Sequence, residues 1–337
     1  MIPLAWIYGF IQGVRNFLFD KGCISGKKAG LKTIVIGNLS VGGTGKTPHV
    51  IWLGKELINR GYSICILSRG YGRSTRGFRW VNSSDHPDIV GDEPLEIKIA
   101  IPEIPVAVDG NRHRALSIIQ NEIIPAPDFV ILDDGFQHRS LIPHFSIILS
   151  SVNRPFFTDL IMPAGSLREA ANSIKRADYL IITDTTENND EIEKSWAFIS
   201  GVKNPEKISS SSYMYENIIP LFKGKKDIQK DKIDSILLVS GIANPDTILS
   251  ELKTKATIHI LRYRDHHKYT RKDIKTIISN FSRLEGEDKI LLTTMKDAMK
   301  LKHFDQLKEL PVYVLNRKVV MDEKKMNKLF EIILNYG

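Results

Sequence analysis

The stretch "VIGNLSVGGTGKTPHVIWL" (residues 35–53) runs from an apolar, strand-like segment through a glycine-rich turn into a segment with helical spacing. This order is typical of a phosphate-binding loop, in which backbone N–H groups at the start of a helix face phosphate oxygens. In such a loop a lysine reaches the outer phosphates and the next hydroxyl binds Mg²⁺. An incidental glycine-rich turn is the alternative, and Ser40 stands where the usual pattern has its first glycine. The residues expected to bind a nucleotide are Gly42, Gly43, Thr44, Gly45, Lys46 and Thr47.

A second segment, "DFVILDDGFQH" (residues 128–138), has the pattern of a strand that ends in a metal-binding carboxylate. In nucleotide-hydrolysing enzymes of this kind, such a carboxylate holds Mg²⁺ directly or through water. Asp133 takes that place, and Asp134 doubles the negative charge. The alternative is a strand that ends in a polar turn. His138 fits a packing role in the turn as well as a substrate or metal contact.

The rest of the chain alternates short, branched apolar runs with helix-like segments, which predicts a mostly parallel sheet covered on both faces. The predicted fold class is α/β, a P-loop NTPase-like sheet with a second, smaller α/β domain. Polar, Ser- and Lys-rich sequence between the two predicts a connector. The expected division is an amphipathic helix at 1–22, the P-loop domain at 23–202, a linker or hairpin at 203–232 and the smaller domain at 233–337.

Composition narrows the class of partner. The chain has 337 residues, 42% of them hydrophobic and 26% charged, and a formal net charge of +8. Its two cysteines are too few for a disulfide framework, so a reducing compartment is expected. The positive charge suits an anionic partner. Nucleic acid is not expected, because the basic residues are scattered and form no stripe with aromatic residues.

The first 22 residues predict a helix that lies on a membrane surface. Apolar and aromatic residues recur there at helical spacing, but their run is broken at Gln12 and Arg15, well short of the roughly 20 residues needed to cross a bilayer. Basic residues follow closely, which favours anionic headgroups. The alternative is a helix that packs on the protein's own core.

Further polar clusters follow other predicted strands, and the carboxyl ends of parallel strands share one edge of a sheet. "GDEP" carries Asp92 and Glu93, suited to helix capping, to base chemistry or to metal binding. Arg112 and Arg168 each stand near a predicted helix start. Each alone is typical of a cap or a solvated charge, and their convergence on one edge is what indicates a site.

"YRDHHKY" contains His266 and His267. Adjacent side chains of an extended strand point in opposite directions, so one of the two is expected to face a site. Zinc binding is the alternative, but further Cys or His residues at metal-binding spacing are missing.

Taken together, the motifs resemble one family. "GNLSVGGTGKTP", "LSRGYGR", "GDEP", "DDGFQH", "MPAGSLRE", "DHHKY" and "TTMKDAMKL" occur in the order seen in the tetraacyldisaccharide 4'-kinase family of the lipid A pathway. The apolar first helix and the serine in the P-loop agree with it. Met295 departs from it, since glutamate is expected before the Lys-Asp pair.

The resemblance implies a lipid kinase that uses ATP and Mg²⁺ to phosphorylate the 4'-hydroxyl of a tetraacylated disaccharide 1-phosphate. The implied partners are a membrane-embedded glycolipid and the anionic surface of the bacterial inner membrane. The implied location is the cytoplasmic face of that membrane, with a peripheral or monotopic attachment. A membrane-associated ATPase switch with an altered P-loop is the alternative, although such switches carry a lysine where this chain has Val41.

The resemblance also implies roles for the candidate residues. Lys46 contacts the β- and γ-phosphates, and Asp92 is the leading base, supported by one of the two histidines. Asp134 is the alternative base. The remaining roles are Mg²⁺ binding by Thr47 and Asp133, metal or water binding by Glu93, and contact with phosphate or the sugar headgroup by Arg112, His138 and Arg168.

Overall fold

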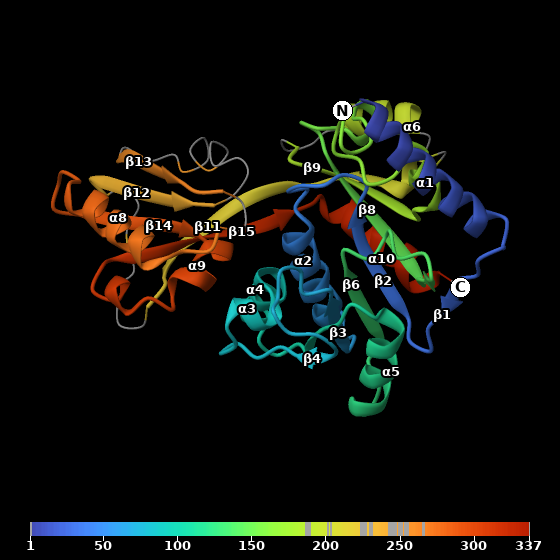
Figure 1. The fold of residues 1–337 in the computed structure, drawn as a ribbon, viewed down its shortest axis with the longest axis horizontal. Coiled ribbons are helices and arrows are strands. Elements are labelled where there is room, and N and C mark those ends of the chain that lie inside the picture. The colour runs from blue at the N-terminus through green and yellow to red at the C-terminus, as the bar shows by residue number, and fades with distance from the viewer. Residues whose placement is uncertain are drawn as a thin grey trace.

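The computed structural model has two lobes, each built on a mostly parallel β-sheet (Figure 1). The first lobe contains an eight-stranded sheet and the second a five-stranded sheet. This arrangement confirms the predicted α/β class. The structure describes residues 2–185, 190–200, 202, 204–222, 228, 232–241, 248, 252, 256–264 and 267–336, without the side chains of 215–217.

The helices that cover the sheets have the following bounds. The α-helices are α1 (Ile2–Asp20), α2 (Lys46–Asn59), α3 (Pro87–Val90), α4 (Asp92–Ala100), α5 (Arg112–Glu122), α6 (Asp190–Ser200), α8 (Arg271–Ser282), α9 (Met295–Leu301) and α10 (Glu323–Asn335). Short 3₁₀ helices are η1 (Phe156–Thr158), η2 (Ala171–Arg176), η3 (Pro205–Lys207) and η5 (Asp305–Leu307).

The eight-stranded sheet has the order β10-β9-β8-β2-β6-β3-β5-β4, and every neighbouring pair is parallel except β5 and β4. Its strands are β2 (Thr33–Asn38), β3 (Ile64–Ser68), β4 (Arg79–Trp80), β5 (Val106–Val108), β6 (Phe129–Asp133), β8 (Phe145–Ser151), β9 (Tyr179–Thr183) and β10 (Ile208–Ser210). A separate parallel pair is formed by β1 (Lys27–Lys28) and β7 (Leu141–Ile142).

The central strand β2 shows why these residues form a two-sided core. Successive side chains of a strand point to opposite faces. Ile34 and Ile36 pack in the cluster that also holds the apolar residues of α2 and α4, whereas Val35 packs with those of α5. Both faces are buried, so the strand reads as a continuous apolar run.

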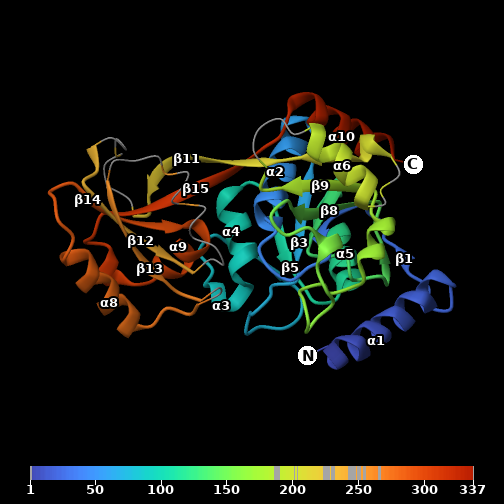
Figure 2. The same ribbon diagram turned by 90° about the horizontal axis from the view of Figure 1, so that it is seen from above.

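The five-stranded sheet has the order β11-β15-β14-β12-β13, parallel except for β11 against β15. Its strands are β11 (Ser212–Pro220), β12 (Ser235–Ser240), β13 (Thr257–Arg262), β14 (Lys289–Thr294) and β15 (Val312–Val320). The long strands β11 and β15 run from the second lobe to the first, as both views show (Figures 1 and 2). After β15 the chain enters α10, whose Phe330 packs against Trp52 of α2 with ring centroids 6.0 Å apart.

The expected linker and domain boundaries differ from this arrangement. The range 203–232 contains β10, an edge strand of the first sheet, and β11, an edge strand of the second. The range 233–337 ends in α10, which packs on the first lobe. Edge strands tolerate polar residues, so a Ser-rich sequence such as that of β10 resembles a connector. The amphipathic pattern of α10 does not reveal which sheet it covers.

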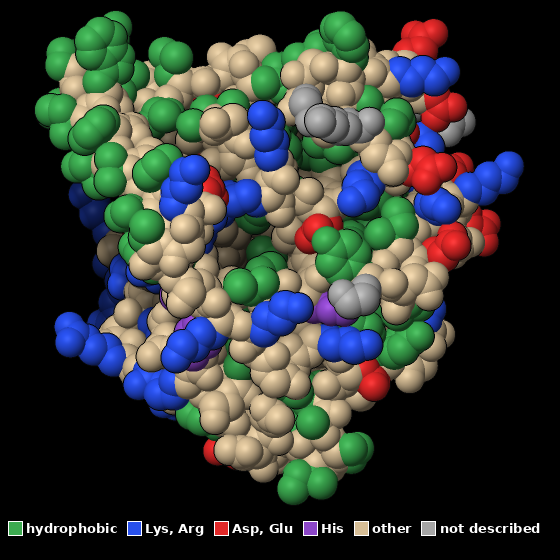
Figure 3. Space-filling view, turned by 90° about the vertical axis from the view of Figure 1, so that its right-hand side faces the viewer, with side chains coloured by type: hydrophobic (Ala, Val, Ile, Leu, Met, Phe, Trp, Pro, Cys, Tyr) green, Lys and Arg blue, Asp and Glu red, His purple; other side chains and the backbone are tan. Residues whose placement is uncertain are grey.

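Helix α1 lies along the outside of the first lobe (Figure 2). Of its residues, all of which the structure describes, Ala5 alone is buried. The exposed fraction of the side chain is 75% for Trp6 and 73% for Phe10. Hydrophobic side chains gather over α1 at the upper left of Figure 3, with Lys and Arg side chains below them. No helix in the described part of the chain is long and apolar enough to cross a membrane.

Candidate active site

The predicted site residues converge on one large cleft of about 1530 Å³. The carboxyl ends of β2, β3 and β6 contribute its floor, and α1, α4 and β15 contribute its walls. The predicted residues that line it are Gly42, Gly43, Thr44, Gly45, Lys46, Thr47, Glu93, Arg112, Asp133, Asp134, His138 and Arg168. Of the residues that the structure describes, Asp92 and His267 are outside this lining, and His266 lies outside the described residues.

The P-loop links β2 to α2 through a backbone that only glycine adopts easily. Gly45 caps α2 with φ of 79°, and Gly42 has φ of 119°. Apart from the adjacent residues, no atom of the described part of the chain lies within 4 Å of the position that a Cβ would take at Gly42 or Gly43, so the backbone there is open to a ligand. At Gly45, by contrast, a Cβ would lie 1.7 Å from the hydroxyl oxygen of Tyr213. The loop is therefore open on one side and closed on the other.

Lys46 is held by the strand end and by the acidic pair. Its Nζ donates to Asn38 Oδ1 at 3.3 Å and lies 3.8 Å from Asp134 Oδ1. The Asn38 amide also donates to Thr44 Oγ1 at 2.8 Å, which ties the loop to β2. These contacts place the ammonium group beside Asp134, within the cleft.

Asp133 is the buried carboxylate at the end of β6. Its Oδ2 accepts a hydrogen bond from Ser68 Oγ at 3.0 Å, and its Oδ1 has no hydrogen-bond partner among the described residues. Burial, with smaller contributions from Glu93 and Asp134, raises the pKa of Asp133 to about 7. A buried, unpaired carboxylate oxygen is expected to gain strongly from a cation.

Asp134 is held in the left-handed region, with φ of 54°. The Arg168 Nη1 atom donates to both carboxylate oxygens of Asp134, at 3.0 and 2.9 Å. Arg168 also donates to Gln137 Oε1 at 3.4 Å. Because a non-glycine residue is rarely found at positive φ, this ion pair is one of the contacts that maintain the Asp134 conformation.

Two predicted substrate contacts are engaged with the protein itself. Arg112 is buried and donates to the backbone carbonyls of Asp109 and Asp133, the latter at 3.4 Å. Burial lowers the pKa of the Arg112 guanidinium. His138 shares a hydrogen bond of 3.0 Å with Ser140 Oγ, and burial, together with Arg112 and other nearby cations, lowers the pKa of its imidazole. A role in contacting substrate stays a prediction for both.

The predicted base lies at the contact between the lobes. Asp92 Oδ2 is 2.6 Å from Lys300 Nζ, and Lys300 also donates to the backbone carbonyl of His267 at 3.1 Å. The His267 ring is 3.1 Å from Asp273 Oδ2 and stacks on Tyr263 with centroids 4.7 Å apart. Lys300 thus connects Asp92 to the histidine segment, while the His267 side chain is engaged within its own lobe.

Sequence reasoning missed a group of residues beside the P-loop. Arg317 of β15 donates to Asp184 Oδ1 at 3.2 Å, and its guanidinium carbon lies 3.3 Å from the ring centroid of Tyr213. His49 is fully buried between Gly45 O and Ser211 Oγ, and burial lowers its pKa to about 4. Neither β11 nor β15 carries a motif, so no sequence signal pointed to this wall of the cleft.

The residues present fit a magnesium ion that is shared with phosphates. Mg²⁺ is typically bound by one or two carboxylates, waters and substrate phosphates. Asp133 supplies the unpaired buried oxygen, and the buried Thr47 supplies a hydroxyl in the same cleft. Within the described ranges no cluster of three or more His, Cys, Asp or Glu side chains could hold a metal alone.

Comparisons with known proteins show which family the chain resembles. A family model described as tetraacyldisaccharide-1-P 4'-kinase matches residues 1–335. The tetraacyldisaccharide 4'-kinase of Bacteroides thetaiotaomicron is 36% identical over 100% of this chain and 92% of that protein. The enzyme of the same name from Flavobacterium psychrophilum is 34% identical over 100% of this chain and 96% of its own length.

A solved structure shows the same fold. LpxK from Aquifex aeolicus, crystallised with ATP, superposes with a TM-score of 0.76 at 28% identity, covering 98% of both chains. The P-loop and the acidic strand end therefore stand in a fold that binds ATP in a related protein. The relatives match the chain from end to end, as the order of its motifs predicted, and the chain belongs to the tetraacyldisaccharide-1-P 4'-kinase family.

Proposed function

We propose that the protein transfers the γ-phosphate of ATP to the 4'-hydroxyl of a tetraacyldisaccharide 1-phosphate at the cytoplasmic face of the inner membrane. The observation that carries this proposal is that one cleft is lined both by the P-loop and by Tyr8, Gln12 and Arg15 of α1. A glycolipid beneath α1 would then present its headgroup to the nucleotide. Family membership supports the same reaction.

The chain's own residues supply the positioning and charge neutralisation that phosphoryl transfer requires. Lys46 neutralises the outer phosphates from the start of α2, beside the backbone N–H groups of the P-loop. Thr47 and Asp133 would hold Mg²⁺, and Glu93 would bind it or a water molecule. When bound, the ion neutralises charge that develops on the phosphates. Arg168 keeps Asp134 next to Lys46 and the cleft.

Asp92 is the proposed base for the acceptor hydroxyl, with His266 or His267 in support. Asp134 is less suited to this role, because both of its oxygens accept from Arg168 and one faces Lys46. Asp92 holds an ion pair with Lys300 of the second lobe. A movement of the second lobe that separates this pair would remove a cation that stabilises the ionised Asp92 carboxylate, and the carboxylate would then accept a proton more readily. We propose this movement as a step that accompanies nucleotide binding.

Membrane association is proposed to be peripheral, through α1. Its exposed aromatic and aliphatic side chains would enter the boundary between headgroups and acyl chains, and the nearby basic residues would face anionic lipids. Each apolar side chain that is buried in this boundary contributes roughly 1.5–3 kcal/mol to the free energy of membrane binding. Several such side chains on one helix are enough for a stable peripheral attachment.

The test is transfer of label from γ-labelled ATP to tetraacyldisaccharide 1-phosphate in mixed micelles with Mg²⁺. A labelled lipid is expected from the wild type and none from Lys46→Ala. Release of free phosphate without labelled lipid would overturn the proposal and favour an ATPase switch.

The base assignment has its own test in the same assay. Asp92→Ala is expected to lower kcat by roughly 10²–10⁴-fold with little change in ATP affinity. Asp305→Ala, at an exposed aspartate of the second lobe, is the matched control and should leave kcat unchanged. Near-normal turnover by Asp92→Ala would remove Asp92 from the mechanism.

A further inference from the structure

The loop at 160–169, here called the clamp loop, is paired with the entrance of the P-loop. The backbone N–H of Val41 donates to Ser166 O at 2.8 Å, and that of Arg168 donates to Leu39 O at 2.8 Å. Between these bonds, Ser40 and Leu167 form an antiparallel bridge. The clamp loop therefore extends the end of β2 as a short strand, and a shift of one moves the other.

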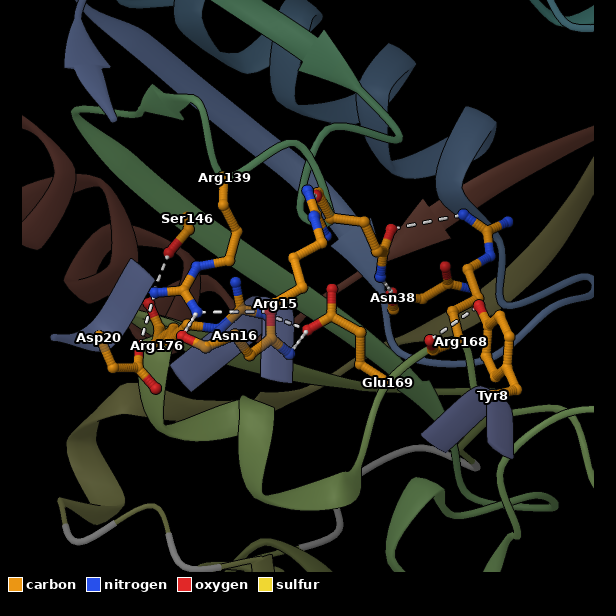
Figure 4. Close-up of polar contacts among 11 residues, drawn as sticks. Tyr8, Arg15, Asn16, Asp20, Asn38, Arg139, Ser146, Arg168, Glu169 and Arg176 are labelled. Atoms are coloured by element: carbon orange, nitrogen blue, oxygen red, sulfur yellow. Dashed lines mark hydrogen bonds and ion pairs between the residues drawn. The ribbon is translucent and has the colours of Figure 1, made fainter. Parts of the chain in front are cut away.

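The other side of the clamp loop is held by α1. The Tyr8 hydroxyl donates to the backbone carbonyl of Arg168 at 3.2 Å, and Asn16 Nδ2 donates to Glu169 Oε2 at 3.1 Å (Figure 4). A Cβ at Gly9 would lie 3.2 Å from Ile161 Cδ1, so the helix backbone also approaches the loop closely. These contacts are two turns apart on the polar side of a helix whose opposite side is apolar and exposed.

Glu169 is the buried residue at which the clamp loop contacts α1. Its side chain is fully buried, and Oε2 forms an ion pair with Arg176 as well as accepting from Asn16. Arg176 in turn stacks on Phe136, with its guanidinium carbon 4.4 Å from the ring centroid. Among the described residues the buried Oε1 of Glu169 has no hydrogen-bond partner, so the bonds that offset the cost of burying this carboxylate are those to Oε2. Asn16 supplies one of these donors only when α1 is seated on the loop.

A second contact between α1 and the site runs through Gln137. The Arg15 guanidinium donates to Gln137 O at 3.1 Å, and the Gln137 amide donates to Asn38 O at 2.8 Å. Asn38 is the residue that bonds both Thr44 and Lys46. Through these bonds α1 is connected to both ends of the P-loop, to Leu39 and Val41 at its start and to Thr44 and Lys46 at its end.

We propose that Tyr8, Asn16 and Glu169 are positioning residues that couple the seating of α1 to the placement of Arg168 against Asp134. The coupling rests on the proposed function in one respect, because membrane binding is what seats α1. When α1 is docked, the clamp loop holds the Arg168 backbone between Tyr8 and Leu39, and the guanidinium stays on Asp134. When α1 is displaced, Glu169 loses a donor and the entrance of the P-loop loosens. Membrane binding that holds α1 in this position would therefore favour the assembled site where the lipid substrate is found.

The experiment uses the full chain with Tyr8→Phe and Asn16→Ala, and with Asn280→Ala as the matched control. Asn280 is an exposed helical asparagine of α8 that bonds within its own helix. Each of the first two variants removes one hydrogen bond, which corresponds to a loss of roughly 3–10-fold in kcat. KM for ATP and co-sedimentation with anionic liposomes should be unchanged. An unchanged kcat in both variants would overturn the proposal.

A double-mutant cycle tests whether Tyr8 acts through Arg168. Tyr8→Phe is expected to cost nothing further when Arg168 is already replaced by Ala, because the cation that Tyr8 helps to place against Asp134 is then gone. Losses that multiply in the double variant would overturn the coupling.

Amide hydrogen exchange supplies a readout that does not depend on activity. Exchange at Val41 and Arg168 should be at least about 3-fold faster in Asn16→Ala than in Asn280→Ala, because their donor bonds open more often. Equal exchange rates would overturn the coupling even if the lipid is labelled. A wild type that fails to label the lipid, with faster exchange in Asn16→Ala, would overturn the proposed function and leave the coupling standing.

Discussion

The raised pKa of Asp133 predicts that replacing this residue by Asn destroys activity and at the same time stabilises the protein at neutral and alkaline pH. Asn has nearly the same shape as Asp and can still accept the hydrogen bond from Ser68. It carries no charge, so the cost of burying an ionised group disappears. The effect on stability should therefore depend on pH, whereas the loss of transfer should not.

The size of the effect follows from the two pKa values. The pKa of Asp133 is raised from 3.8 to about 7, with burial as the main cause. The stability that this group contributes is fully present below pH 4 and is lost as the pH rises through 7, because the folded protein must then give up a proton that it holds more tightly than the unfolded chain. Between pH 5 and pH 8 the loss is about 3 kcal/mol, at roughly 1.4 kcal/mol per pKa unit.

The assay is thermal unfolding of wild type and Asp133→Asn, without Mg²⁺ or nucleotide, from pH 5 to pH 8. The variant is expected to gain in Tm relative to the wild type as the pH rises. Saturating Mg²⁺ with an ATP analogue should reverse the order at pH 8 by stabilising the wild type alone. A difference in Tm that stays constant across this pH range would refute the reasoning about the buried carboxylate.

Two further predictions use matched pairs within the chain. Gly45→Ala should abolish ATP binding in an equilibrium titration, because a Cβ at this position would collide with the Tyr213 side chain. Gly61→Ala is the control and should bind ATP normally, because Gly61 has a similar positive φ of 86° but open space around it. Equal ATP affinities of the two variants would contradict the steric argument. Phe10→Ser should reduce co-sedimentation with anionic liposomes. Phe198→Ser, at an even more exposed phenylalanine on α6, should not reduce it. An equal reduction in both variants would show that α1 contributes no more to membrane binding than α6 does.

The sequence was sufficient to predict that the P-loop and the acidic strand end lie together, because each is a short run of consecutive residues. A P-loop consists of consecutive residues, and Asp133 and Asp134 follow a strand whose burial is visible in its composition. The carboxyl ends of β2 and β6 then had to meet, because the two strands are parallel neighbours. For these residues, spacing and strand order are sufficient to predict proximity.

The wall formed by β11 and β15 could not be predicted in the same way. Arg317 and Tyr213 are about a hundred positions apart in sequence and meet through an antiparallel pair that crosses between the lobes. Likewise, the pairing of Asp92 with Lys300 depends on how the two lobes are placed, which no periodicity encodes. Arg112 lines the cleft, but its burial and its bonds to the backbone carbonyls of Asp109 and Asp133 could not be predicted from the sequence.

The return of α10 to the first lobe has a consequence for synthesis on the ribosome. Phe330 fills the core beside Trp52, and Arg60 of the same region stacks on its ring. All of the second lobe is translated before residue 330 emerges, so the core of the first lobe lacks the Phe330 side chain at the stage when the second lobe can already fold. Domains generally fold in the order of their synthesis, and here the lobe that is begun first is closed last. Nascent chains of this protein should therefore depend on chaperones longer than the length of the first lobe alone would suggest.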